Sequence, residues 1–534
     1  FLPPGEWTNL VKVTKAMNDF ALAHPEEVVF EKAFPVNTKE ITAAYILSLA
    51  QMSGADRAVQ QIVSGKVETV PFDADPKGSN AIAIHPSRTD SGEAFLAINS
   101  HQPLDGPVAW YEAHLHSEEG WNILGGLFPG GAMIFHGVNE NLGWAHTVNF
   151  PDLLDLYQLD INPENEDQYQ VDGEWLELEE ETVWLRVKLW DLITIPFPKK
   201  IWKSIYGPTL VTDQGTFSVR LGALERIGAP EQWWRMNKAK NFTEFYNAIS
   251  LQGLSMFNIM YADKNDTIFY ISNSKMPYRN PDTSYHWNST LPGNTTATLW
   301  NEFKPLSALP QMLNPKSGYL FNANHSPFLA SSESDNLNPK DFDVNDGYET
   351  YHDNRSRRAK DLIDQLDKIS YEDIKRIKFD RQLPNPILFP YGFTADSMFM
   401  VDENKYPQFA SIITTLKNWD HNAVAESKGA LIYNLAYYNV PVVMEGRKND
   451  KLTMAEAVKV YQIIYDFLQT NYGRTDLTLG DVQRLVRGKE NWPQGGMPDV
   501  LAAVMSEPFG KDKRKMNSGD AYINFVRFPK NGGL

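Results

Sequence analysis

The chain has 534 residues, no cysteine, and 50 basic against 67 acidic side chains, which gives a formal net charge of −17. This length fits about three domains or one large catalytic fold, and 12% aromatic residues exclude a disordered chain. The missing cysteines exclude disulfide frameworks, thiolate zinc sites and cysteine nucleophiles. The acidic balance argues against a nucleic-acid partner, and no run reaches the roughly 18 apolar residues of a membrane span.

In chain order, residues 7–64 are predicted to be helical, because Ile41, Tyr45, Ile46 and Leu49 fall at helical spacing. The polar stretch 66–78 predicts an exposed linker. Turn signals between short apolar runs then predict an antiparallel meander, with strands at 81–84, 94–98, 132–135 and 153–159. Residues 160–300 mix strand-like, Trp-rich segments with loops, and helical patterns return at 356–380 and 453–506. We expect an α+β protein with a large antiparallel sheet system and a helical insertion near 400–510.

The sequence lacks the G-x-S-x-G elbow, the P-loop, G-x-G-x-x-G and H-E-x-x-H. His114 and His116 are two residues apart and would share one face of a strand, but nothing nearby completes a metal-ligand set. We interpret them as a polar strand face. A metal-dependent amidohydrolase is therefore a distant alternative.

Ser79 follows Gly78 at the boundary between the polar linker and the first strand. If the bond between them is cut, the Ser79 α-amine, with an ordinary pKa of about 7.7–8.0, can act as base for its own hydroxyl. One residue would then supply both nucleophile and base.

Four further segments accompany Gly78-Ser79-Asn80. They are Asn99-Ser100-His101-Gln102-Pro103, Trp110-Tyr111-Glu112-Ala113-His114-Leu115, Gly143-Trp144-Ala145-His146-Thr147-Val148-Asn149 and Asn322-Ala323-Asn324-His325-Ser326-Pro327. Together they resemble the penicillin amidase family of N-terminal-nucleophile hydrolases, which includes penicillin, cephalosporin and acyl-homoserine-lactone acylases. The resemblance implies a four-layer αββα sandwich of antiparallel sheets, and hydrolysis of an N-acyl amide through a serine acyl-enzyme.

The resemblance also implies roles for single residues. Ser79 matches the catalytic serine that self-cleavage at Gly78–Ser79 exposes, and His101 matches a histidine that hydrogen-bonds the nucleophile region. The Val148 backbone N–H and the Asn324 side-chain amide match the two halves of the oxyanion hole, and Arg355 matches an arginine that orients this site. Such neutral donors stabilise a developing oxyanion without a metal, so no cofactor is expected to be required for catalysis.

The acyl pocket is predicted to include Gln102, Tyr111, Phe135, His136 and His146. Phe135 stands where glutaryl-cleaving cephalosporin acylases carry a carboxylate-binding arginine, and a buried carboxylate without a cation is costly. We therefore expect a largely apolar acyl group, aliphatic or aromatic.

Some members of the family bind calcium, and the matching positions here are Asp152, Asp155 and Asp335 with the backbone carbonyl of Leu154. Oxygen ligands of this kind suit calcium, so we list a structural calcium ion as an expectation. The glutamate that completes the site in those enzymes has no match around residues 56–61; three solvated carboxylates are the alternative.

The resemblance divides the chain into residues 1–65 as the helical end of a small chain, 66–78 as a linker or propeptide, and 79–534 as the large chain. It implies a heterodimer of the two processed chains in a bacterial periplasm or secreted fraction. Since the sequence begins Phe1-Leu2-Pro3-Pro4 without an initiator methionine, we expect a processed or partial product. A catalytically silent, uncut member that acts as a binding or structural protein is the alternative function.

Overall fold

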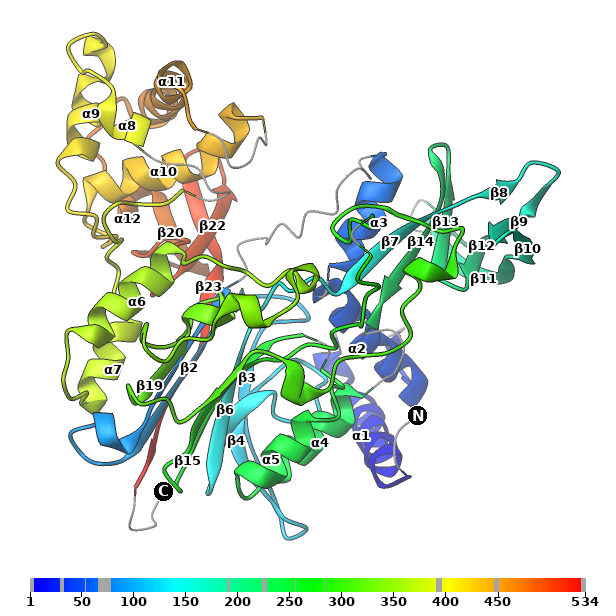
Figure 1. The fold of residues 1–534 in the computed structure, drawn as a ribbon. Coiled ribbons are helices and arrows are strands. Elements are labelled where there is room, and N and C mark those ends of the chain that lie inside the picture. The colour runs from blue at the N-terminus through cyan, green and yellow to red at the C-terminus, as the bar shows by residue number, and fades with distance from the viewer. Residues whose placement is uncertain are drawn as a thin grey trace.

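The computed structural model describes residues 4–28, 33–52, 54–65, 78–189, 193–222, 228–254, 256–282, 284–389, 396–445 and 451–529. Two mainly antiparallel sheets face each other, and each carries helices on its outer side (Figure 1). This is the α+β four-layer arrangement expected from the sequence.

The first sheet has seven strands in the order β19-β1-β2-β23-β20-β21, with β22 also paired to β23. Their bounds are β1 (Gly78–Ile84), β2 (Ala94–Pro103), β19 (Tyr319–Asn322), β20 (Gln483–Arg487), β21 (Glu490–Pro493), β22 (Val504–Phe509) and β23 (Lys513–Phe528). Alternation along β1 sends Ile82 and Ile84 toward α6 (Asn354–Asp364) and α7 (Tyr371–Lys378). Ala81 and Ala83 face the second sheet, in a core that both sheets share.

The second sheet also has seven strands, in the order β18-β16-β15-β6-β5-β4-β3. Their bounds are β3 (Tyr111–Ser117), β4 (Trp121–Leu127), β5 (His136–Asn139), β6 (Leu142–Thr147), β15 (Asn258–Asp263), β16 (Ile268–Ser272) and β18 (Gln311–Leu313). Its outer face packs on α4 (Ala229–Lys238) and α5 (Phe242–Ile249) through an aromatic-rich core that includes Trp144, Phe245 and Tyr261.

Two smaller sheets extend from the sandwich on the right of Figure 1. Their strands are β7 (Leu154–Leu159), β8 (Ile161–Asn162), β9 (Asn165–Val171), β10 (Glu174–Glu177), β11 (Glu179–Leu189), β12 (Ile193–Ser204), β13 (Gly207–Thr212), β14 (Gly215–Leu221) and β17 (Leu291–Pro292). The N-terminal helices are α1 (Pro4–Ala23), α2 (Thr38–Met52) and α3 (Ala55–Ser64). Of these, α1 contacts α4 and α3 contacts β13 and β14.

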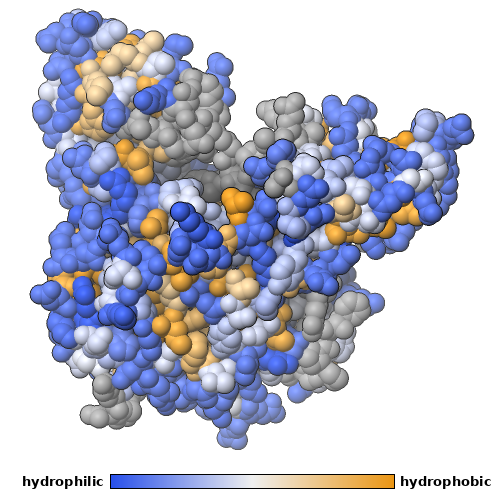
Figure 2. Space-filling view, in the orientation of Figure 1, coloured by the Kyte–Doolittle hydropathy of each residue, from blue (hydrophilic) through white to orange (hydrophobic). Residues whose placement is uncertain are grey.

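A separate helical region with its own hydrophobic core lies above the first sheet in Figure 1. It contains α8 (Asp396–Met400), α9 (Ala410–Lys417), α10 (Lys428–Val443), α11 (Met454–Tyr472) and α12 (Leu479–Val482). The face in Figure 2 is mainly hydrophilic, as the net charge predicts, with scattered hydrophobic patches. Among the described residues, no helix has both the length and the apolar character that crossing a bilayer requires.

Three expectations about the elements are wrong. The expected single meander is split, because β1 and β2 join one sheet while β3 to β6 join the other. Residues 132–135 form no strand, since the backbone N–H and C=O of Ile134 bond the Asn237 side chain instead of a neighbouring strand. The helical insertion ends at Val482, after which the chain returns to the first sheet as β20, β21 and β22.

Of the expected linker 66–78, residues 66–77 lie outside the described residues.

Candidate active site

Ser79 is the second residue of β1 and is only 3% exposed. Its backbone N–H donates to Asn324 Oδ1 at 2.6 Å, and its hydroxyl donates to the Gly78 carbonyl oxygen at 2.6 Å. In the antiparallel register with β2, Gly78 lies opposite His101 and Ser79 lies opposite Ser100. The hydroxyl of Ser79 therefore lies directly beside the peptide group that precedes it.

Asn324 lies in the turn that follows β19, with a left-handed backbone φ of 66°, a conformation that asparagine tolerates better than most residues. Its Nδ2 donates to the Val148 carbonyl at 2.7 Å, while its Oδ1 accepts from Ser79. One carboxamide thus links the end of β6, where Val148 follows, to the start of β1. An amide nitrogen carries two hydrogens, so the bond to Val148 leaves a second N–H of Asn324 for a ligand.

Arg355, in the first turn of α6, fixes the other side of this carboxamide. Its guanidinium donates to Asn324 Oδ1 at 3.2 Å, to the Ser79 carbonyl at 3.0 Å and to Asn80 Oδ1 at 3.1 Å. Asp353 at 3.0 Å balances its charge, and the Asp499 carboxyl lies 3.9 Å away. Burial, reinforced by the nearby Asp353, raises the pKa of Asp499 to about 8.

His101 is 1% exposed. It belongs to a polar group with Asp520 and Lys378, two residues that the sequence analysis did not identify. Its Nε2 lies 3.4 Å from Asp520 Oδ1, and Lys378 Nζ donates to Asp520 Oδ2 at 2.6 Å. Burial lowers the pKa of His101 to about 4, so the imidazole is neutral near pH 7. A Cβ built at Gly78 would lie 2.9 Å from His101 Nδ1, so glycine permits the close approach of this ring.

Asp520 reaches His101 only because β23 pairs with β2, and the pairing shifts register between Ser100 and His101. No local motif marks Asp520 or Lys378, since each is one charged residue among many. The tertiary pairing is the only signal that identifies them.

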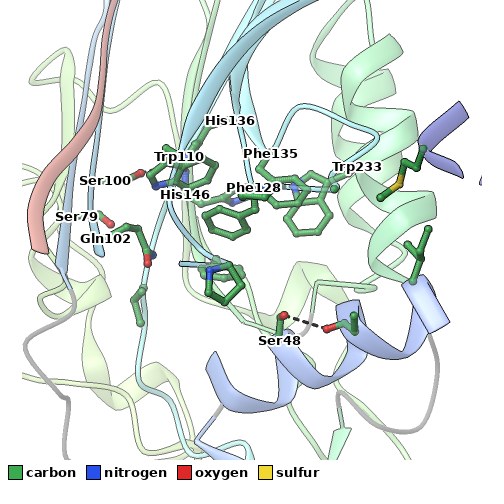
Figure 3. A pocket seen from close by; sticks show the side chains of 18 residues that line it. Ser48, Ser79, Ser100, Gln102, Trp110, Phe128, Phe135, His136, His146 and Trp233 are labelled. Carbon is green, nitrogen blue, oxygen red and sulfur yellow. Dashed lines mark hydrogen bonds between the residues drawn. The ribbon is translucent and has the colours of Figure 1, made fainter. Parts of the chain in front are cut away.

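A cavity of about 260 Å³ opens beside Ser79. Phe128, Phe135 and Trp233 gather along it in Figure 3, with Ser79, Ser100 and Gln102 at one side. The remaining lining residues are Met17, Ile41, Ala44, Ser48, Pro107, Trp110, Pro129, Gly130, His136, His146, Val148 and Phe257. Apolar and aromatic side chains thus form most of its wall.

Four of the five residues predicted for the acyl pocket line this cavity: Gln102, Phe135, His136 and His146. The expectation for Tyr111 is wrong, because its side chain is 43% exposed and lies outside the cavity lining. Sequence reasoning missed Trp110, the neighbour of Tyr111, and the contributions of α1 and α2. His114 is exposed and bonds Asn122, and His116 is exposed on the same strand, as a polar strand face requires.

The residues predicted to bind calcium do not form a calcium cage. The Arg279 guanidinium lies between two of them, with Nη2 3.2 Å from Asp152 and 3.1 Å from Asp155, and Trp300 Nε1 donates to Asp155 at 2.6 Å. Leu154 begins β7 opposite Leu221, and Asp335 accepts instead from the Ser317 N–H. Over the described ranges, the one group of three ligand side chains within 4.8 Å is His24, Glu26 and Glu27, which includes none of them. Arg279 thus supplies the positive charge that a metal ion would bring.

We expect Arg279→Gln to lower the free energy of unfolding by about 3–5 kcal/mol, because it leaves the buried Asp155 carboxylate and the partly buried Asp152 carboxylate without their cation. Denaturant titration measures the change. Arg474→Gln, which removes an exposed pair with Asp476, is the control and should change the value by less than about 0.5 kcal/mol. A chelator should leave the melting temperature of the unsubstituted chain unchanged; a clear decrease would contradict the role given to Arg279.

Residues 2–531 match the family model described as penicillin amidase. The acyl-homoserine lactone acylase PvdQ of Pseudomonas fluorescens is 25% identical over 508 residues, which cover 85% of this chain and 64% of that protein. Penicillin G acylase of Escherichia coli is 26% identical over 294 residues, covering 51% of this chain and 33% of that protein.

The chain therefore spans less than two thirds of the length of these relatives. A solved structure of the thermostable penicillin G acylase from Alcaligenes faecalis superposes with a TM-score of 0.59, covering 85% of this chain and 88% of that one. At 17% identity, this likeness concerns the fold alone.

Proposed function

The chain belongs to the penicillin amidase family, and from this premise we propose that it hydrolyses N-acyl amides through an acyl-enzyme on Ser79. The observation that supports this most is the single carboxamide of Asn324, which holds both the Ser79 nitrogen and the Val148 carbonyl. It brings the proposed nucleophile together with the two proposed oxyanion donors, the Asn324 amide and the Val148 backbone N–H.

The first step is self-cleavage at Gly78–Ser79. The Ser79 hydroxyl oxygen attacks the Gly78 carbonyl carbon, the Gly78–Ser79 C–N bond breaks, and the hydroxyl proton passes to the departing nitrogen. Water then hydrolyses the resulting ester, which leaves a Gly78 carboxylate and a Ser79 with a free amine and hydroxyl. The 2.6 Å contact between the Ser79 hydroxyl and the Gly78 carbonyl oxygen supports this step.

In the cut protein, the α-amine of Ser79 accepts the proton of its own hydroxyl as that oxygen attacks the substrate carbonyl. The nearby Arg355 cation disfavours the ammonium form, which keeps the amine available as a base. The proton passes to the leaving amine, and water releases the acyl group in a second attack. The two oxyanion donors stabilise the negative charge in both steps.

Mass spectrometry of the purified protein tests the proposal. A cut between Gly78 and Ser79 is the expected result. A chain that stays intact and hydrolyses no N-acyl amide would favour the alternative, a silent member that binds ligands without processing.

We expect the cut chains to remain together as a heterodimer, because α1 and α3, which precede the cut, contact α4, β13 and β14 beyond it. Gel filtration after maturation should give one peak containing both chains. A periplasmic or secreted location is part of the same proposal and rests on the resemblance to bacterial acylases.

Acyl preference provides a further prediction. An aliphatic or aromatic N-acyl amide should have a kcat/KM at least about tenfold above that of a glutaryl amide, because a carboxylate in this aromatic cavity would be buried without a cation. The glutaryl methyl ester amide, of similar length but uncharged, is the matched control and should recover most of the loss. Faster cleavage of the glutaryl amide would contradict the prediction.

A further inference from the structure

The two proposed oxyanion donors belong to different sheets of the sandwich. Asn324 follows β19 in the first sheet, and Val148 follows β6 in the second sheet (Figure 1). The two sheets share an apolar core, and apolar burial has no directional preference. Hydrogen bonds between the sheets are directional, so they can fix the distance between the two donors.

Asn322, the last residue of β19, forms such bonds. Its Oδ1 accepts from the Asn324 backbone N–H at 2.9 Å and from the Thr147 hydroxyl at 2.5 Å. Asn324 carries one of the proposed donors, and Thr147 immediately precedes Val148, which carries the other. One buried carboxamide thus contacts both segments of the proposed oxyanion hole.

The backbone fixes the orientation of this carboxamide. The Asn324 N–H can only donate, and the His325 carbonyl, which accepts from Asn322 Nδ2 at 3.2 Å, can only accept. The oxygen of the carboxamide therefore faces Thr147, and the Thr147 hydroxyl donates its single hydrogen to it. None of these groups carries a charge, so their hydrogen bonds persist across the working pH range.

Two further buried residues of the second sheet hold Asn322 in place. Asn258 of β15 lies opposite Thr147. Its Nδ2 donates to the Val148 carbonyl and to Asn322 Oδ1, at 3.3 Å in each case. The Tyr270 hydroxyl donates to Asn258 Oδ1 at 2.7 Å and accepts from Asn322 Nδ2 at 3.4 Å. Each of these buried side chains has hydrogen-bond partners, the condition under which a polar network makes a core rigid.

We propose that Asn322 is a positioning residue, which holds the Val148 N–H and the Asn324 amide at the spacing that one oxyanion requires. The inference rests on the proposed function and deepens it. Asn322 lies outside the cavity lining, so it acts through the two donors and not on the substrate. Donors aimed at a developing oxyanion contribute most when they are fixed before the reaction. A displaced donor leaves substrate binding almost unchanged but stabilises the transition state less.

Steady-state kinetics, normalised to the amount of cut chain, test the proposal. Asn322→Ala should lower kcat about 10–100-fold. It should change KM by less than about threefold, because the donors act mainly on the transition state. Thr147→Val keeps the shape but removes the hydroxyl and should lower kcat several-fold, whereas Thr147→Ser keeps the donor and should retain the activity. A merely structural role would reduce the amount of active protein and leave kcat per cut chain unchanged.

Asn434→Ala is the matched control, because Asn434 is a buried asparagine of α10 that bonds Gln483 in the helical region. Its kcat per cut chain should equal that of the unsubstituted chain. An unchanged kcat in both Asn322→Ala and Thr147→Val would overturn the proposal. If Ser79→Ala is inactive at the same time, the proposed function stands and only the positioning role fails.

Hydrogen exchange separates the inference from the proposed function, because it needs no hydrolysis. In Asn322→Ala, the backbone amides of residues 147–150 on the second sheet and 323–326 on the first should exchange about three- to tenfold faster. This result would support the inference even if the unsubstituted chain hydrolyses no amide. Thr147→Val, which removes a single hydroxyl, gives the same comparison if Asn322→Ala does not fold. Unchanged exchange at residues 147–150, or equal acceleration in α10, would overturn the proposal.

Discussion

Ser79→Ala is expected to leave the protein as one uncut chain and to reduce kcat on N-acyl amides by at least about 10⁴-fold, the scale seen when a nucleophile is removed. The substitution removes the atom that attacks both the Gly78 carbonyl and the substrate. It should barely affect folding, because the hydroxyl bonds only the neighbouring Gly78 carbonyl among the described residues. Denaturing electrophoresis and a steady-state assay measure the two effects.

Ser79→Cys provides a conservative comparison, since a thiol can also attack and should retain some self-cleavage. Ser218→Ala serves as the control for removing a buried hydroxyl elsewhere and should be cut and active. Normal turnover by Ser79→Ala would remove Ser79 from the mechanism.

Replacing Asn324 should have the second largest effect. Asn324→Gly should reduce kcat about 10²–10³-fold, which corresponds to roughly 2.7–4 kcal/mol for one oxyanion donor. The same change releases the Ser79 nitrogen from Oδ1, so slower self-cleavage is expected as well. The assay must therefore be normalised to the amount of cut chain, determined by mass spectrometry or active-site titration.

Glycine is chosen to replace Asn324 because it removes the side-chain amide without straining the backbone at this position. Asn324 has a φ of 66°, which glycine adopts freely and alanine does not, so Asn324→Ala should lose stability in addition to rate. Asn324→Asp keeps Oδ1 but loses the N–H donors, and it should be as inactive as the glycine variant. Full activity of the cut Asn324→Asp protein would exclude the side-chain amide as an oxyanion donor.

The buried charges explain why the site depends on distant elements. Arg355 contacts Ser79, Asn80 and Asn324 from the start of α6, and Asp499, beyond the helical region, lies 3.9 Å from its guanidinium. A buried arginine is tolerated only when it is paired and hydrogen-bonded. Asp353 at 3.0 Å supplies that pairing, and the segment after the helical region places Asp499 beside the same guanidinium.

Local sequence patterns were sufficient to predict the strands that carry the site and to identify its most distinctive residues. The run from Ala81 to Ile84 predicted a strand, which in the structure begins three residues earlier at Gly78. The combination around Ser79, His101, Val148 and Asn324 indicated the family that the comparison confirms. The roles given to these residues stay predictions, because their contacts bring them together without testing their chemistry. Local patterns failed where partners distant in sequence decide the outcome, as at Ile134, whose backbone bonds Asn237 from α4.

The sequence by itself determined the fold class, the family and the chemical identity of the groups around Ser79, since these depend on residue types and short spacings. Only the tertiary structure decided two further features: Asp520 and Lys378 lie behind His101, and Arg279 lies between Asp152 and Asp155. Each depends on which strands pair and on which distant segments lie beside them. Those properties arise when distant segments pack together, because burial removes water and forces every polar atom to find a partner within the protein.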